Sequence, residues 1–217
     1  MENAFSSLLN PARVWSRHEI LSPMHPVPKA AGVYAWYFRE IPPFISFDGC
    51  HKYNELTLLY VGISPSAPPR NGKAPSRQTL SDRIRFHYNG NASGSTLRLT
   101  LGCLLSKKLN IHLRRLGCSE RMTFWTGEDK LDEWMEKNAY VTWQITDKPW
   151  ILEEQLISNL FLPLNIDKNE NNPNHDLVSE IRRGPRAVES SHSGCVRGKQ
   201  RGLASRAAWA DYQRPGR

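Results

Sequence analysis

The segments GVYAWYF at residues 32–38 and TLLYVGI at residues 57–63 decide the fold of this chain. Both are dense in β-branched and aromatic residues, a composition that predicts strands. We expect the two strands to pair as a hairpin across the long loop between them. Each strand carries a tyrosine beside a glycine, so Tyr34 and Tyr60 could converge on one site. Taken alone, the two tyrosines fit ordinary strand positions better than a functional site.

A basic helix is predicted at residues 78–88, QTLSDRIRFHY. Arg83 and His87 are four residues apart and share a face of this helix. The planar fork of an arginine suits a phosphate oxygen, and a histidine one turn later could bind the same phosphodiester or shuttle a proton. As a single feature, this pattern fits a solvated basic face better than a site.

A second helix of interest is predicted at residues 149–161, with Pro149 in its first turn. Glu153 and Glu154 lie next to its apolar ridge, and a carboxylate there suits Mg²⁺, which prefers hard oxygen ligands. Two acids in an early turn also suit the helix dipole without any metal. Asn165 follows in a turn, where asparagine is common for local reasons.

The order and spacing of these segments carry more information than any one of them. Five short motifs follow one another in the chain: Gly32-Val33-Tyr34, Tyr60-Val61-Gly62, Leu80-Ser81-Asp82-Arg83, Leu152-Glu153-Glu154-Gln155-Leu156-Ile157 and Pro163-Leu164-Asn165. With these motifs the chain resembles the GIY-YIG nuclease superfamily over about residues 30–168. The separation of 12 between Glu153 and Asn165 matches the family spacing and selects Glu153 over Glu154.

The resemblance implies an α+β fold, in which a small three-stranded antiparallel sheet is flanked by helices. Residues 139–145 (AYVTWQI) would form the third strand. We expect the nuclease domain at residues 29–180. An N-terminal extension at residues 1–28 would be extended because of its prolines. The tail at residues 181–217 is basic and poor in large aliphatic residues, so we expect it to be disordered.

The resemblance also implies a metal-dependent DNA endonuclease with a one-metal mechanism. Glu153 would hold Mg²⁺ or Mn²⁺, and Tyr34 would be the general base for the attacking water. Arg83 would neutralise charge on the phosphorus, and Tyr60 would orient the water or the phosphate. His87 would assist Tyr34 or the phosphate, as in some restriction enzymes of the superfamily, and Asn165 would fix the geometry.

Two features of the sequence qualify the resemblance. Many members carry a lysine directly after the second motif's glycine, where this chain has Ile63. If that lysine helps to bind phosphate, Arg70, Lys73 or Arg83 would have to supply the charge here. The segment at residues 90–98 is similar to a subgroup of bacterial members whose role is not known.

Positive charge is concentrated in two blocks of this chain, whose net charge is +8. Residues 70–121 hold eleven Lys or Arg against two acidic residues, and residues 182–217 hold nine against two. Such segments favour a polyanion such as DNA, although a solvated surface with a disordered tail would carry the same charges. The residues expected to contact the nucleic acid backbone are Arg70, Lys73, Arg85, Arg98, Lys107 and Lys108.

The composition of the chain disfavours a membrane protein, a secreted protein and a zinc ribbon. No apolar run is long enough to span a bilayer and the N-terminus does not have the pattern of a secretory signal, so we expect a cytoplasmic protein without a membrane partner. The four cysteines include no CxxC pair, which disfavours a zinc ribbon. The sequence gives no oligomeric state. Two alternatives stay open: a non-catalytic nucleic-acid-binding module with the same fold, and an interaction protein that binds an acidic partner.

Overall fold

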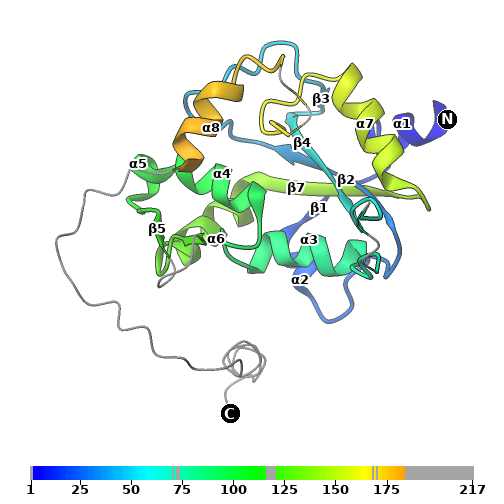
Figure 1. The fold of residues 1–217 in the computed structure, drawn as a ribbon, viewed down its shortest axis with the longest axis horizontal. Helices are drawn as coiled ribbons and strands as arrows, with labels where there is room; N and C mark the ends of the chain where they lie inside the picture. Colours follow the sequence, from blue (N-terminus) through cyan, green and yellow to red (C-terminus); the bar gives the residue numbers. More distant parts are fainter. Residues whose placement is uncertain are drawn as a thin grey trace. The chain divides into compact units, whose positions relative to one another are not determined.

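The core of the protein is a five-stranded antiparallel sheet with the strand order β1-β7-β2-β4-β3 (Figure 1). The structure, a computed structural model, describes residues 2–69, 71, 74–115, 121–167, 169 and 171–183. The strands are β1 (Trp15–Ser16), β2 (Gly32–Phe38), β3 (Lys52–Tyr53), β4 (Leu56–Ser64) and β7 (Ala139–Ile145). Strand β2 lies at the centre, between β4 and β7.

The predicted three-stranded sheet corresponds to β7-β2-β4, and the prediction of only three strands was wrong. The two additional strands, β1 and β3, lie at the edges and have two residues each. A two-residue strand is too short to show the alternation that predicts strands from sequence. A separate two-stranded sheet is formed by β5 (Arg114–Arg115) and β6 (Met122–Thr123).

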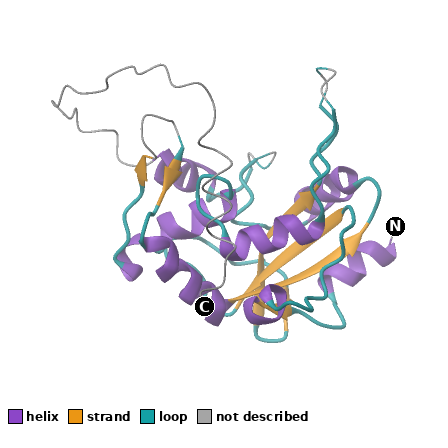
Figure 2. Cartoon of the chain, turned by 90° about the horizontal axis from the view of Figure 1, so that it is seen from below, coloured by secondary structure: helices purple, strands orange, loops and turns teal. Residues whose placement is uncertain are grey.

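Helices lie on both faces of the main sheet (Figure 2). Helix α3 packs on one face of β2 and β4, and α7 packs on both strands from the other face. Residues 96–109 form two helices, α4 and α5, which divide at Leu105. The helices are α1 (Glu2–Leu9), α2 (Arg17–Leu21), α3 (Leu80–Asn89), α4 (Thr96–Leu104), α5 (Ser106–Leu109), α6 (Gly127–Asn138), α7 (Pro149–Asn159) and α8 (His175–Arg183).

The N-terminal extension is not the extended segment that its prolines predicted. It contains α1, β1 and α2, while all of its prolines lie outside the helices. Helix α2 begins where the Glu19 carboxylate accepts hydrogen bonds from the backbone and hydroxyl of Ser16, a capping arrangement. The Tyr37 hydroxyl donates to the Leu8 carbonyl at 2.7 Å and ties α1 to the sheet.

Alternation along β2 divides the buried side chains into two cores. The even-numbered residues Tyr34, Trp36 and Phe38 face the core that includes α3, α4 and α6. The odd-numbered residues Val33, Ala35 and Tyr37 face the core that includes α1 and α7. Because β2 is buried on both faces, its sequence is apolar throughout rather than alternating.

A bulge in β4 sets which of its residues share the Tyr34 face. Trp36 pairs with Tyr60 and Tyr37 pairs with Leu58, so Leu59 is an extra residue without a partner in β2. Beyond the bulge, Tyr60 and Gly62 lie opposite Trp36 and Tyr34. Bulges often re-aim side chains beside functional sites.

The C-terminal part of the described chain is helical further than predicted. Helix α8 continues to Arg183, so residues 181–183 are not part of a disordered tail. The remainder of that predicted tail, residues 184–217, lies outside the described residues. Within the described part of the chain, no helix has the length and apolarity needed to cross a membrane.

Candidate active site

A cavity of about 570 Å³ lies beside β4, where side chains from both helix layers meet. Five of the six predicted catalytic residues line it, namely Tyr34, Tyr60, Arg83, Glu153 and Asn165. The sixth, His87, is fully buried behind Tyr34. The structure therefore brings together residues that are as much as 131 positions apart in the chain.

Gly62 makes room for the Tyr34 ring in this cavity. The two residues lie directly opposite each other on β4 and β2. A Cβ atom at position 62 would lie 2.5 Å from the Tyr34 hydroxyl oxygen, much closer than van der Waals contact allows. The phenol can therefore lie across the strand only because position 62 has no side chain.

A buried chain of hydrogen bonds holds the Tyr34 hydroxyl. Tyr34 Oη lies 2.8 Å from His87 Nε2, and His87 Nδ1 lies 2.7 Å from Ser95 Oγ. Ser95 Oγ in turn accepts from the backbone N–H of Arg98 at 3.1 Å, because Ser95 is the N-cap of α4. Tyr34, His87 and Ser95 are each at most 1% exposed.

One arrangement of protons gives an acceptor to the donors of both Ser95 and His87, and leaves the Tyr34 hydroxyl to direct its own proton into the cavity that Tyr34 lines. If the Ser95 hydroxyl donates to Nδ1, the Nε2–H of neutral His87 donates to Tyr34 Oη. In the opposite arrangement, the buried Ser95 hydroxyl would have no acceptor within the described chain. Because buried polar groups are nearly always hydrogen-bonded, we assign the first arrangement. The Tyr34 Oη then accepts a hydrogen bond from His87.

Burial and charge perturb the titration of these groups. Burial, with the positive charges of Arg83 and Arg98, keeps the pKa of His87 well below its usual value, so the ring is neutral. Burial raises the pKa of Tyr34 to about 12, although the charge and a hydrogen bond of Arg83 oppose that rise. Burial and the nearby Tyr34 also raise the pKa of Tyr60. Both tyrosines are therefore protonated in the free protein at neutral pH.

Helix α3 aims Arg83 at the cavity. A capping box at Thr79 and Asp82 starts the helix, and Arg83 follows it directly. Arg83 Nη1 donates to the Gly94 carbonyl at 2.8 Å, which ties the arginine to the loop that carries Ser95. One edge of the guanidinium is fixed in this way beside Tyr34.

The carboxylates in the lining are Glu153 and Asp167. Glu153 comes from α7, and its neighbour Glu154 is exposed and outside the lining. Within the described ranges, no group of three or more His, Cys, Asp or Glu could form a complete metal cage. One or two carboxylates fit Mg²⁺ or Mn²⁺, because such ions keep several waters and complete their shell with substrate phosphate. Glu153 would hold the ion, with Asp167 within the same cavity.

Asn165 acts through the backbone of β4. Its side-chain Oδ1 accepts from the Val61 N–H at 2.8 Å, and its Nδ2 donates to the Val61 carbonyl at 2.9 Å. The amide thus pairs with the edge of β4 as a neighbouring strand would. Asn172 Nδ2 lies within 3.2 Å of the carbonyl oxygens of Leu162, Pro163 and Asn165, which fixes the turn. Asn165 thereby joins the segment after α7 to the strand that carries Tyr60.

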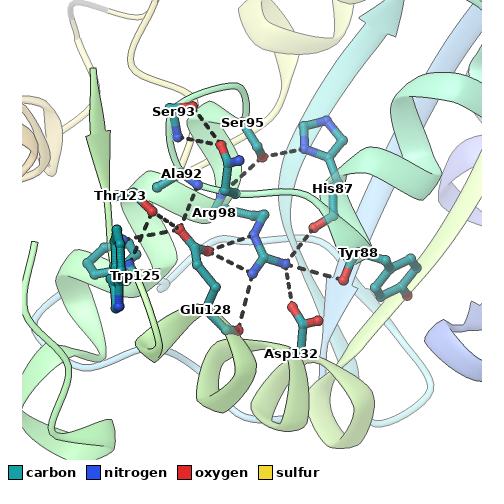
Figure 3. A network of polar contacts seen from close by, with 12 residues as sticks. His87, Tyr88, Ala92, Ser93, Ser95, Arg98, Thr123, Trp125, Glu128 and Asp132 are labelled. Atoms are coloured by element: carbon teal, nitrogen blue, oxygen red, sulfur yellow. Dashed lines mark hydrogen bonds and ion pairs between the residues drawn. The ribbon is translucent and has the colours of Figure 1, made fainter. Parts of the chain in front are cut away.

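The prediction that Arg98 contacts nucleic acid was wrong. Its side chain is fully buried and forms ion pairs with Glu128 at 2.8 Å and Asp132 at 2.6 Å (Figure 3). It also donates to the carbonyl oxygens of His87 and Tyr88, at the end of α3. Arg98 therefore supports the loop between His87 and Ser95 from inside the protein.

Arg98→Met is expected to lower the free energy of unfolding by about 3 kcal/mol, because it removes a fully buried guanidinium that pairs with the partly buried Glu128 and Asp132. Chemical denaturation would measure this loss. Lys108→Met is the matched control: its pair with Glu40 is exposed and contributes at most about 1 kcal/mol. An unchanged unfolding free energy in Arg98→Met would contradict the structural role of Arg98. It would again favour the prediction that Arg98 contacts nucleic acid.

The other predicted nucleic acid contacts stay predictions. Arg70 and Lys73 lie outside the described residues. Arg85 is half-buried on α3, close enough to His25 for its charge to lower the pKa of that histidine, although burial is the larger cause. Lys107 and Lys108 are exposed on α5.

A family model described as the GIY-YIG catalytic domain matches residues 32–186. The chain belongs to the GIY-YIG family. Neither a curated protein nor a solved structure matches it. A GIY-YIG catalytic domain implies a phosphodiester hydrolase of the nuclease type, and therefore a nucleic acid substrate. The match begins at Gly32 and includes α8.

Three residues in or beside the cavity of this GIY-YIG domain were not found by sequence reasoning. Ser95 lies in the segment 90–98, whose resemblance to a family subgroup was noted without a role. Asp167 and Arg182 line the cavity from outside the quoted motifs. The amphipathic spacing of Val178 and Arg182, four residues apart in a helix, was a signal that could have identified Arg182 as inward-facing.

Proposed function

We propose that this GIY-YIG protein is an endonuclease that hydrolyses phosphodiester bonds in DNA with one Mg²⁺ or Mn²⁺ ion, in the cytoplasm. The observation that carries the proposal is the convergence of Tyr34, Arg83 and Glu153 on one cavity. A candidate base, a cation and a carboxylate within one cavity are the groups that metal-assisted phosphodiester hydrolysis needs.

Tyr34 is the proposed general base and acts as the tyrosinate. Its Oη takes a proton from water while the water oxygen attacks phosphorus, and the bond from phosphorus to the leaving sugar oxygen breaks. That oxygen then takes a proton from solvent. The tyrosinate is rare in the free protein because the pKa of Tyr34 is about 12. Hydrogen bonds from His87 and Arg83 to Oη favour the charged form, and so lower the cost of forming it.

The remaining residues bind and orient. Arg83 neutralises the charge that builds on the phosphoryl oxygens during attack, usually the largest contribution to catalysis. A divalent ion on the Glu153 carboxylate would supply positive charge that polarises the phosphoryl group and stabilises the leaving oxygen. Tyr60 orients the water or the phosphate from the strand beside Tyr34. Asn165 holds that strand and the end of α7 in register.

Incubation of the purified protein with supercoiled plasmid tests this proposal. We expect nicked or linear product in Mg²⁺ or Mn²⁺ and none after chelation with EDTA, because one carboxylate and water make a readily reversible metal site. Gel electrophoresis separates the three forms of the plasmid. Salt-sensitive DNA binding without nicking in any divalent metal would instead support a non-catalytic nucleic-acid-binding module.

A further inference from the structure

We propose that Arg182 on α8 binds a backbone phosphate of the nucleic acid strand in the catalytic cavity, in addition to the phosphate contacted by Arg83. The inference rests on the proposed function, because it assumes that a nucleic acid enters this cavity. Helix α8 supplies Arg182 and no other residue to the lining. Arg182 is thus a second arginine at the site, from an element that the five quoted motifs do not reach.

The position of Arg182 on α8 is unusual for a charged residue. It lies four residues after Val178, which is completely buried, so both project from the inward face of the helix. The next residue, Arg183, is exposed. An amphipathic helix normally reserves its inward face for apolar side chains. The same turn contains Ile181, which packs against the main core.

Within the described residues, Arg182 forms no hydrogen bond or ion pair that would account for this position, and its electrostatic neighbour is the Cys103 thiol of α4. The Nη1 of Arg182 is buried and makes no hydrogen bond within the described part of the chain. The contrast with Arg98 is direct, because the buried guanidinium of Arg98 has two carboxylates and backbone carbonyl oxygens as acceptors. A buried donor without an acceptor costs free energy, and native proteins seldom retain one without a functional reason.

The chemistry of a phosphate supplies what the site lacks. A guanidinium has five donors and no acceptor, and its fork matches two oxygens of a phosphate. The neighbouring lining residue Thr96, at the start of α4, has a hydroxyl that can donate to the same kind of group. Helix α8 packs directly against α4, so the two residues belong to one wall of the cavity. Arg83, on α3, belongs to another.

The test compares Arg182→Gln with Arg183→Gln, which removes the same charge from the adjacent exposed position. Both changes are made in a Glu153→Gln background, so that a labelled DNA duplex oligonucleotide stays intact while its Kd is measured over a series of KCl concentrations. Loss of one phosphate contact reduces the slope of log K against log salt by about 0.9. We expect that reduction, with binding weakened about tenfold or more, in Arg182→Gln but not in Arg183→Gln. Arg182→Lys should retain the slope and part of the affinity.

Thermal unfolding in the absence of DNA separates binding from a structural role. Because Arg182 Nη1 has no acceptor within the described residues, Arg182→Gln should melt at or above the wild-type temperature. Equal Kd values and slopes for Arg182→Gln and wild type, equal losses in both glutamine variants, or a clear fall in melting temperature would each overturn the inference. Plasmid cleavage by wild type is scored separately: its absence contradicts the proposed nuclease, whereas these binding outcomes decide the role of Arg182.

Discussion

Glu153→Gln is expected to reduce plasmid cleavage about a thousandfold or more in saturating Mg²⁺. The substitution keeps the size of the side chain and removes the charge that would hold the divalent ion. A metal ion contributes several kcal/mol to stabilising the transition state of phosphoryl transfer, and about 4 kcal/mol corresponds to a thousandfold in rate. Single-turnover cleavage of a labelled duplex, with product measured on a denaturing gel, would report the chemical step.

Glu154→Gln is the matched control, since it removes the same charge from the adjacent residue of α7. Glu154 is exposed and outside the cavity, so this variant should cleave at close to the wild-type rate. A second readout does not depend on activity: Mn²⁺ binding followed by electron paramagnetic resonance should weaken in Glu153→Gln alone. If Glu153→Gln cleaved DNA at the wild-type rate, the one-metal mechanism would be wrong. If both variants lost the same fraction of the cleavage rate, the loss would reflect damage to α7 rather than removal of a metal ligand.

The long strands of the fold were predictable because local sequence and tertiary burial favour the same structure. The bounds of β2 and β7 are those expected from sequence, 32–38 and 139–145. Strands β1 and β3 were missed because two residues carry no periodic signal. The helices of the extension were missed because proline disfavours a helix only at its own position and the residues just before it, and the four prolines all lie outside α1 and α2. Glu19, three residues after Ser16, was a usable capping signal for α2.

The site residues also fall into two groups: those that the sequence predicts, and those that only tertiary contacts reveal. Motif spacing predicted five side chains that the fold collects around one cavity, although their roles stay proposals. Arg98 was misplaced because the sequence does not show that the acidic residues of α6 pack against it in the fold. Arg98 lies three residues before Leu101, so the two share a face of the helix, and this spacing already indicated that Arg98 faces the core. Ser95 could be placed on His87 only from the tertiary structure, because a hydrogen bond between two helices has no local signature.

Tyr34→Phe is expected to reduce the cleavage rate between about a hundredfold and ten-thousandfold, the usual contribution of a general base. The ring stays in place and only the hydroxyl is lost. The best control is Tyr37→Phe, on the same strand but facing the other core. It also removes a buried, hydrogen-bonded hydroxyl, because Tyr37 Oη donates to the Leu8 carbonyl at 2.7 Å and approaches the Leu9 carbonyl at 3.5 Å. Each variant should lose roughly 1 to 3 kcal/mol of stability, because each leaves a buried group unpaired.

The pH profile distinguishes the base from a residue that only supports the structure. With a pKa of about 12, Tyr34 is protonated at pH 7, and its tyrosinate fraction rises tenfold with each unit of pH below that value. The wild-type single-turnover rate should therefore increase between about pH 7 and pH 9, while the residual rate of Tyr34→Phe should lack this dependence. His87 is neutral across that interval because its pKa is lowered, so it does not add a second inflection. Equal rates and equal pH profiles in Tyr34→Phe and Tyr37→Phe would remove Tyr34 as the base, leaving the water to be activated by another group.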